Sequence, residues 1–198
     1  AIVLSVLFGA VILLLSPRKQ VFVATLIGVL LCAYPLVRSQ ELIPLKTVSE
    51  LTAKYDSERQ QSFDFRIDNE DALLAKALER PYFGWGGWGR SALYDRYSGN
   101  SLNILDGAWI ITFGEGGWLG YLSLFSLMVL PLVRLRRDGR KPGGISPYSA
   151  GLAALMAFNL LDLIPNFSIT PITMLIAGAL SYLPPRTQGQ DEVLPQRD

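Results

Sequence analysis

The chain has 198 residues, of which 50% are hydrophobic and 18% charged, and its formal net charge is +1. This near-neutral balance gives no reason to propose a nucleic-acid partner. Histidine is absent and Cys32 is the one cysteine, so an internal disulfide is excluded and the commonest metal ligand is missing. Nucleotide-binding, CxxC and HExxH patterns are also absent, and we expect no metal and no cofactor.

Long apolar runs predict an all-α, polytopic integral membrane protein. A bilayer span needs about 17–25 apolar residues, and several runs approach or exceed that length. The first run is short and begins at Ala1 without a basic segment, so we interpret it as a span cut by truncation, with further spans before it. The runs cover residues 1–15, 21–37, 104–133, 148–164 and 167–183.

Basic residues set the expected orientation in the membrane. The short segments "SPRKQ" and "RLRRDGRKPGG" are rich in arginine and lysine, which predicts that both are cytoplasmic. In a Gram-negative cell this orientation places the chain in the inner membrane, with its long loop in the periplasm. The predicted parts are two transmembrane helices (1–37), a periplasmic loop (38–103), three membrane segments ending in a hairpin (104–183) and a cytoplasmic tail (184–198).

Within the long loop, residues 68–80 ("DNEDALLAKALER") predict an amphipathic helix on the outer membrane surface. Acids fill its first turn, Lys76 and Arg80 its last, and Pro81 ends it. The helix is followed by "RPYFGWGGWGRS" at residues 80–91. Glycine permits close backbone approach, while tryptophan stacks on sugars and favours the headgroup level. Alone, this pattern is more typical of an interfacial anchor, but the flanking arginines favour an anionic headgroup with a sugar attached.

Two carboxylates accompany the third run. Asp106 lies at its outer mouth, and Glu115 lies about two turns deeper within "GEGG", which breaks a regular helix. Because the run exceeds one straight span, we expect the part before Gly116 to be re-entrant or a separate half-helix. An acid at the depth of Glu115 indicates function by default, and a structural pair with a loop arginine is an equal alternative.

Three segments resemble the O-antigen ligase and polymerase family of membrane glycosyltransferases. They are "FRIDNEDALLAKALERPYFGWGGWGR", "DGAWIITFGEGGWLGY" and "NLLDLIPNFSITPITMLIAGAL", and they cover most of residues 65–180. The resemblance implies a substrate glycan carried on undecaprenyl diphosphate. It places Arg66 at a loop arginine implicated in holding the diphosphate, and Glu115 at the family's glutamate. Asp106 replaces the histidine that ligases are thought to use as a base, which favours polymerisation of repeat units, or a related exopolysaccharide step, over ligation to lipopolysaccharide.

The residues support the same chemistry. Departure of a lipid diphosphate needs fixed positive charge, and the acceptor hydroxyl needs a proton acceptor. We expect Arg66 and Asp106 to converge on one cavity at the outer surface; the alternative is that Arg66 pairs locally with Asp64 or Glu70. The candidate set comprises Asp106 and Glu115 as catalytic carboxylates, with Arg59, Arg66, Arg80, Arg90, Trp85 and Trp88 binding diphosphate and glycan.

The predicted function is therefore glycan polymerisation or transfer from undecaprenyl diphosphate. A transporter or exporter of the same lipid-linked glycan, or a non-catalytic assembly component, is the alternative. A transporter needs its charges near the bilayer midplane, whereas an enzyme needs them at the outer surface, where most of them occur here. The expected partners are the lipid-linked glycan, the bilayer and other polysaccharide assembly proteins.

The orientation can be measured with single cysteines at positions 98 and 137, labelled in intact spheroplasts by a membrane-impermeant thiol reagent. We expect label at position 98 and none at 137, because the basic loops stay inside. The parent chain, which carries only Cys32, gives the background. Label at 137 without label at 98 would refute the topology.

Overall fold

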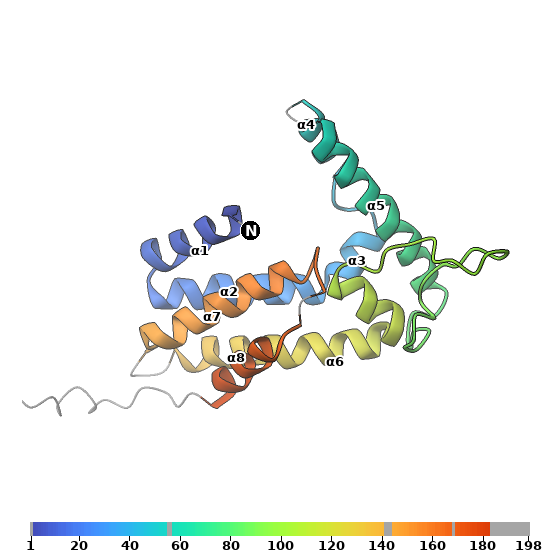
Figure 1. Cartoon of the computed structure of the whole chain (residues 1–198). Helices are drawn as coiled ribbons and strands as arrows, with labels where there is room; N and C mark the ends of the chain where they lie inside the picture. The colour runs from blue at the N-terminus through green and yellow to red at the C-terminus, as the bar shows by residue number, and fades with distance from the viewer. Residues whose placement is uncertain (1, 55–56, 141–143, 168, 183–198) are drawn as a thin grey trace, which may run out of the picture. The chain divides into compact units, whose positions relative to one another are not determined.

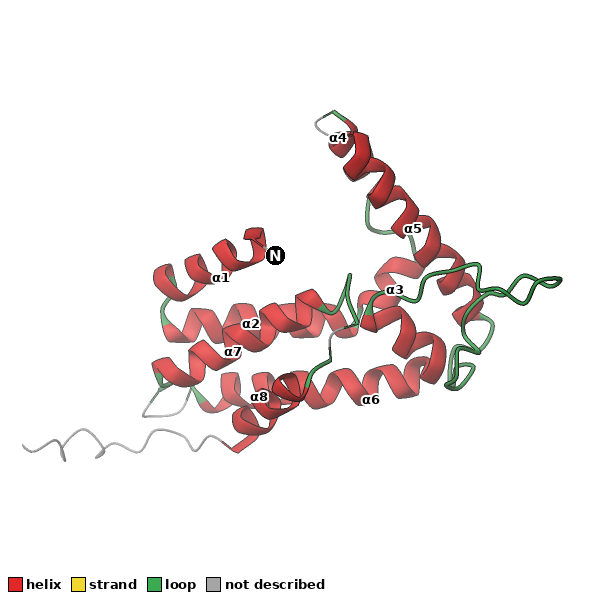
Figure 2. Cartoon of the chain, viewed as in Figure 1, coloured by secondary structure: helices red, strands yellow, loops and turns green. Residues whose placement is uncertain are grey.

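The computed structural model describes residues 2–54, 57–140, 144–167 and 169–182, and this part of the chain is mostly helical (Figures 1 and 2). Its extended pairing is limited to one isolated bridge between Tyr94 and Ser101. The predicted tail, 184–198, lies outside the described residues. The helices are α1 (Ile2–Leu14), α2 (Pro17–Cys32), α3 (Tyr34–Ser39), α4 (Leu45–Ala53), α5 (Ser57–Leu78), α6 (Ala108–Asp138), α7 (Pro147–Asp162) and α8 (Pro171–Tyr182).

Helix α6 is the one described helix that is both long and apolar enough to cross a membrane. Helix α8 is a shorter apolar helix. The five predicted membrane segments coincide in sequence with α1, α2, α6, α7 and α8, so each apolar run is helical over most of its length. The number of segments that cross the bilayer stays a prediction.

The first of two compact units contains α1, α2, the second part of α6, α7 and α8. Helix α7 packs against both α1 and α8. The Phe8 and Phe158 rings meet edge to face, with centroids 5.0 Å apart, and the Thr173 hydroxyl donates to Asn159 Oδ1 at 2.8 Å. Small residues on α7 allow this close packing, and the fully buried ones are Ala150, Ala153, Ala154 and Ala157.

The second unit contains α3, α4, α5, the first part of α6 and residues 163–168. Helix α4 packs along α5 (Figure 1). Helix α5 begins at Ser57, whereas the sequence predicts a start at Asp68. The acids at 68–71 resemble a first turn, but they lie in the middle of the helix, where Glu70 and Asp71 pair with an arginine from α3.

Helix α6 is interrupted at Gly117, in agreement with the break expected at "GEGG". Its backbone has φ 58° and ψ −160°, a conformation that essentially only glycine adopts. The interruption leaves main-chain donors without helical acceptors. The Trp118 amide donates to the Pro81 carbonyl at 2.7 Å, and the Leu119 amide donates to the Tyr82 carbonyl at 3.1 Å.

The glycine-aromatic loop, residues 80–91, makes the reciprocal contacts. The Trp85 amide donates to the Gly114 carbonyl at 2.9 Å, and the Gly86 amide donates to the Glu115 carbonyl at 2.8 Å. A Cβ added to Gly84 would lie 2.5 Å from the Glu115 carbonyl, so no larger residue fits there. The loop glycines therefore allow main chain to pack on main chain at the break in α6.

We expect Gly117→Ala to destabilise the protein by about 2 kcal/mol or more, because alanine is strained in this conformation. Its Cβ would also lie 2.5 Å from the Tyr82 main chain. The unfolding midpoint in detergent should fall by about 5 °C. Gly120→Ala is the matched control, since nothing lies within 4 Å of its Cβ position. Equal midpoints for the two variants would contradict the role of Gly117.

Candidate functional site

The structure brings Arg66 and Asp106 together. A guanidinium nitrogen of Arg66 lies 3.9 Å from Asp106 Oδ2, and the two side chains are 54% and 41% exposed. The separation exceeds the 2.7–2.9 Å of a charge-assisted hydrogen bond, and exposed ion pairs contribute only about 0–1 kcal/mol. The pair is thus accessible to solvent, and little free energy is needed to separate its two side chains.

Asn69 fixes the segment that leads to Asp106. It lies one turn after Arg66 on α5, and its amide nitrogen donates to the Ile104 carbonyl. Its Oδ1 atom accepts from the Ile104 amide at 3.1 Å and from the Asn103 side chain at 3.1 Å. One turn of α5 therefore carries Arg66 and, through Asn69, also holds the segment that leads to Asp106.

The start of α6 is held by residues 163–166. The Ala108 amide donates to the Leu163 carbonyl at 2.9 Å and to the Asn166 carbonyl at 3.1 Å. The Asp106 Oδ1 atom accepts from the Gly107 amide at 3.1 Å. Sequence reasoning assigned residues 163–166 to the closing hairpin and missed this contact, because hydropathy carries no information on which helix end a hairpin contacts.

A buried arginine belongs to a group of polar contacts among α3, α5 and α6. Arg38 from α3 is 5% exposed, with one nitrogen 2.6 Å from Asp71 Oδ1 and another 3.8 Å from Glu70 Oε2 on α5. The buried Trp109 of α6 donates its indole N–H to Glu70 at 3.4 Å. Arg38 was not among the residues predicted from the sequence, and Glu70 was considered only as a local partner of Arg66, a pair that the described ion pairs do not include. The available signal was an arginine directly after an apolar run.

Burial raises the pKa of Glu70, and the nearby carboxylates of Asp71 and Asp106 raise it further. The hydrogen bond from Trp109 and the positive charge of Arg38 act in the opposite direction and lower this pKa. The Arg38 guanidinium therefore partly offsets the cost of an ionised carboxylate at Glu70.

The other candidate residues form a second group in the glycine-aromatic loop. Two cations lie over the Trp85 ring, with Lys76 Nζ at 3.6 Å and Arg80 Cζ at 4.1 Å from its centroid. Its indole N–H donates to the Lys76 carbonyl at 2.8 Å. Arg90 donates to the Gly87 carbonyl at 3.0 Å, whereas Trp88 is 96% exposed. Trp85 and Arg80 thus anchor the loop, and Trp88 presents an open aromatic face.

Glu115 is half-buried and joins the loop through its carbonyl oxygen. No ion pair links its carboxylate to an arginine whose side chain is described. The side chain of Arg59 lies outside the description, and so does any pairing by it. The structural pairing considered for Glu115 thus has no partner among the described arginines.

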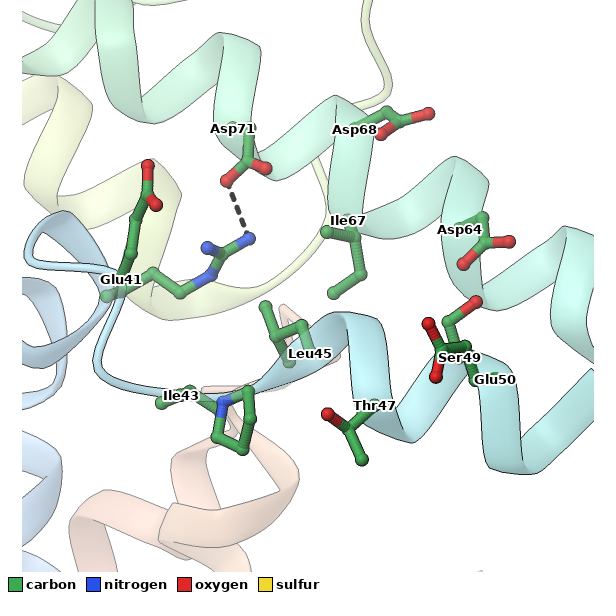
Figure 3. Close-up of a pocket in the computed structure, with 12 residues that line it drawn as sticks. Glu41, Ile43, Leu45, Thr47, Ser49, Glu50, Asp64, Ile67, Asp68 and Asp71 are labelled. Carbon is green, nitrogen blue, oxygen red and sulfur yellow. Dashed lines mark ion pairs between the residues drawn. The ribbon is translucent and has the colours of Figure 1, made fainter.

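An acidic cavity of about 860 Å³ opens on another face of α5. Asp64, Asp68 and Asp71 share that face because they are four and three residues apart, and Arg66 is offset from it. In Figure 3 these carboxylates lie along α5, with Glu50 on the facing helix and Glu41 near the Asp71 end. The dashed line marks the ion pair that Asp71 makes with Arg38. A cavity of this sign disfavours a diphosphate, in contrast to the Arg66 face.

These features define a helical protein with an exposed charged site at one end of a helix that is long and apolar enough to cross a membrane. Residues 1–125 match the family model described as O-antigen ligase, which is more than half of the chain, so the chain belongs to the O-antigen ligase family. Members are membrane proteins that act on lipid-linked glycans. The match includes the first two segments that carry the resemblance and excludes the third. No curated protein and no solved structure matches the chain.

Removal of Arg38 should destabilise the protein in a pH-dependent way. The pKa of Glu70 is raised, so the folded state binds the Glu70 proton more tightly than the unfolded state does. The free energy of unfolding therefore falls as the pH rises from the pKa of Glu70 in the unfolded chain to its pKa in the folded protein. Arg38→Gln removes the opposing cation, and we expect a loss of about 3 kcal/mol at pH 7.5. At about pH 4.5, where the raised pKa leaves a larger share of Glu70 protonated than at pH 7.5, the loss should be smaller.

Thermal unfolding of purified protein at the two pH values measures this difference. The matched control is Arg38→Gln combined with Glu70→Gln, which removes the Glu70 carboxylate and leaves only the lost pair with Asp71, so the extra loss at pH 7.5 should shrink. An equal loss at both pH values for Arg38→Gln alone would show that Glu70 does not depend on Arg38.

Proposed function

We propose that the protein transfers or polymerises glycan from an undecaprenyl-diphosphate carrier at the periplasmic face of the inner membrane. The observation that supports this most directly is the exposed pair of Arg66 and Asp106, 3.9 Å apart. It provides a fixed cation and a carboxylate within the span of one sugar–phosphate linkage. Membership of the O-antigen ligase family supports the same class of reaction.

In the proposed reaction, an acceptor hydroxyl oxygen attacks the anomeric carbon of the donor sugar. The bond from that carbon to the diphosphate oxygen breaks, and the diphosphate leaves with the electron pair. Arg66 neutralises the charge that builds on this leaving group, and Asp106 accepts the proton of the hydroxyl. No metal is needed, because a guanidinium keeps its charge and binds phosphate oxygens in pairs.

The long separation of the ion pair, 3.9 Å, allows the donor to replace Asp106 as the partner of Arg66 in the proposed reaction. A diphosphate carries more negative charge than one carboxylate, so we expect it to displace Asp106 from Arg66 when the donor binds. Separation of an exposed pair costs about 1 kcal/mol at most. Donor binding thereby frees the Asp106 carboxylate to act as a base only when the leaving group is neutralised.

The remaining candidate residues divide by their contacts. Trp88 and Arg90 are exposed and are proposed to contact the glycan, whereas Arg80 and Trp85 hold the loop. The helical rise places Glu115 about 10 Å along α6 from the first residue of this helix, whereas Asp106 lies just before it. We therefore assign the base to Asp106 and keep Glu115 as a second candidate. Arg59 stays a candidate by position only.

Asp106 also bears on the choice between the two reactions of the family. Ligases are thought to use a histidine where this chain has Asp106, which favours polymerisation of repeat units. A deletion strain complemented with full-length protein distinguishes them by its lipid-linked glycans. Single unpolymerised units in the deletion strain indicate a polymerase, and long unligated chains indicate a ligase.

Arg66→Lys should reduce glycan assembly in that strain by about tenfold or more, because lysine keeps the charge but loses the paired contact with phosphate. Arg96→Lys is the matched control, since Arg96 is an exposed arginine in the same loop. Near-normal assembly with Arg66→Lys, at unchanged protein level, would exclude Arg66 from diphosphate binding.

A further inference from the structure

A basic pocket of about 310 Å³ lies in the first unit, separate from the charged pair. Three arginines line it: Arg18 near the start of α2, Arg136 in the last turn of α6, and Arg140 just after α6. Segments far apart in the sequence, one from each of the two basic loops, thus contribute to one pocket. The cytoplasmic location of both loops stays a prediction.

The arginines of this pocket are not neutralised by described carboxylates. Among the described residues no ion pair joins Arg18, Arg136 or Arg140 to an acid, whereas the neighbouring Arg137 lies 3.8 Å from Asp138. Unneutralised guanidiniums around a concave surface attract an anion and suit phosphate oxygens in particular.

An apolar wall completes the pocket. Phe22 lies under the Arg136 guanidinium, which is 4.5 Å from the ring centroid, and Ile145 also lines the opening. From Phe22 an exposed stripe continues along α2 through Leu26 and Leu30, which are each 45–58% exposed at a spacing of four residues. Uncovered apolar surface of this kind marks a membrane-facing side.

We propose that this pocket binds the phosphate of an anionic phospholipid headgroup from the cytoplasmic leaflet. The three arginines hold the phosphate, and the acyl chains lie along the stripe from Phe22 to Leu30. A free phosphate satisfies the arginines but leaves the stripe uncovered, so the lipid is the better fit. The inference is independent of the function proposed for Arg66 and Asp106.

Native mass spectrometry of the full-length protein in detergent tests the proposal, with dioleoylphosphatidylglycerol as the probe and dioleoylphosphatidylcholine as the zwitterionic comparison. The double variant Arg136→Gln with Arg140→Gln should bind phosphatidylglycerol about tenfold more weakly or worse. Arg134→Gln with Arg137→Gln is the matched control, because it removes the same charge from the same segment without touching the pocket lining.

The control variant should keep its affinity within about threefold, since its arginines contribute only general attraction. Equal losses in both double variants would overturn the site, and so would an equal affinity of the parent protein for the two lipids. Displacement of bound phosphatidylglycerol by millimolar inorganic phosphate would show a site for free phosphate and would overturn the assignment to lipid. Unfolding midpoints within about 2 °C of the parent confirm that both variants are folded.

Discussion

Main-chain hydrogen bonds between the glycine-aromatic loop and the break in α6 determine where the site residues lie. Pro81 and Tyr82 accept from the amides that follow Gly117, and the next residues of the loop donate to the carbonyls that precede it. Because the loop directly follows α5, these contacts tie the end of α5 to α6. They require glycine at 84 and 117, where a Cβ would lie 2.5 Å from main-chain atoms.

Helix α5 is held in place at two further points along its length, and both lie near Arg66. Asn69 clamps Ile104, and Arg38 pairs with Asp71 and Glu70. The end of the helix is also held, so the Arg66 main chain is fixed by neighbouring contacts while its side chain is 54% exposed. This arrangement suits a cation that exchanges one anionic partner for another, because only the side chain must move. The acidic cavity on another face of α5 repels an anion, so it would favour binding of a diphosphate on the Arg66 face instead.

The sequence predicted the helical class, the break at "GEGG" and the approach of Arg66 to Asp106, because each depends on local pattern or on shared chemistry. It did not predict the start of α5 at Ser57, since acids in mid-helix resemble a helix start when their partner Arg38 is unknown. Nor did it separate Trp85 from Trp88. The difference between a ring held by Lys76 and Arg80 and an open ring is set by tertiary contacts.

The position of the diphosphate in the full-length protein, determined by cryo-electron microscopy with a lipid-linked donor bound, tests the central claim most directly. The proposed exchange predicts a phosphate oxygen within about 3.2 Å of the Arg66 guanidinium. It also predicts that Asp106 has moved beyond the present 3.9 Å from Arg66 and faces the anomeric carbon. A diphosphate bound elsewhere, with the pair of Arg66 and Asp106 intact, would contradict it.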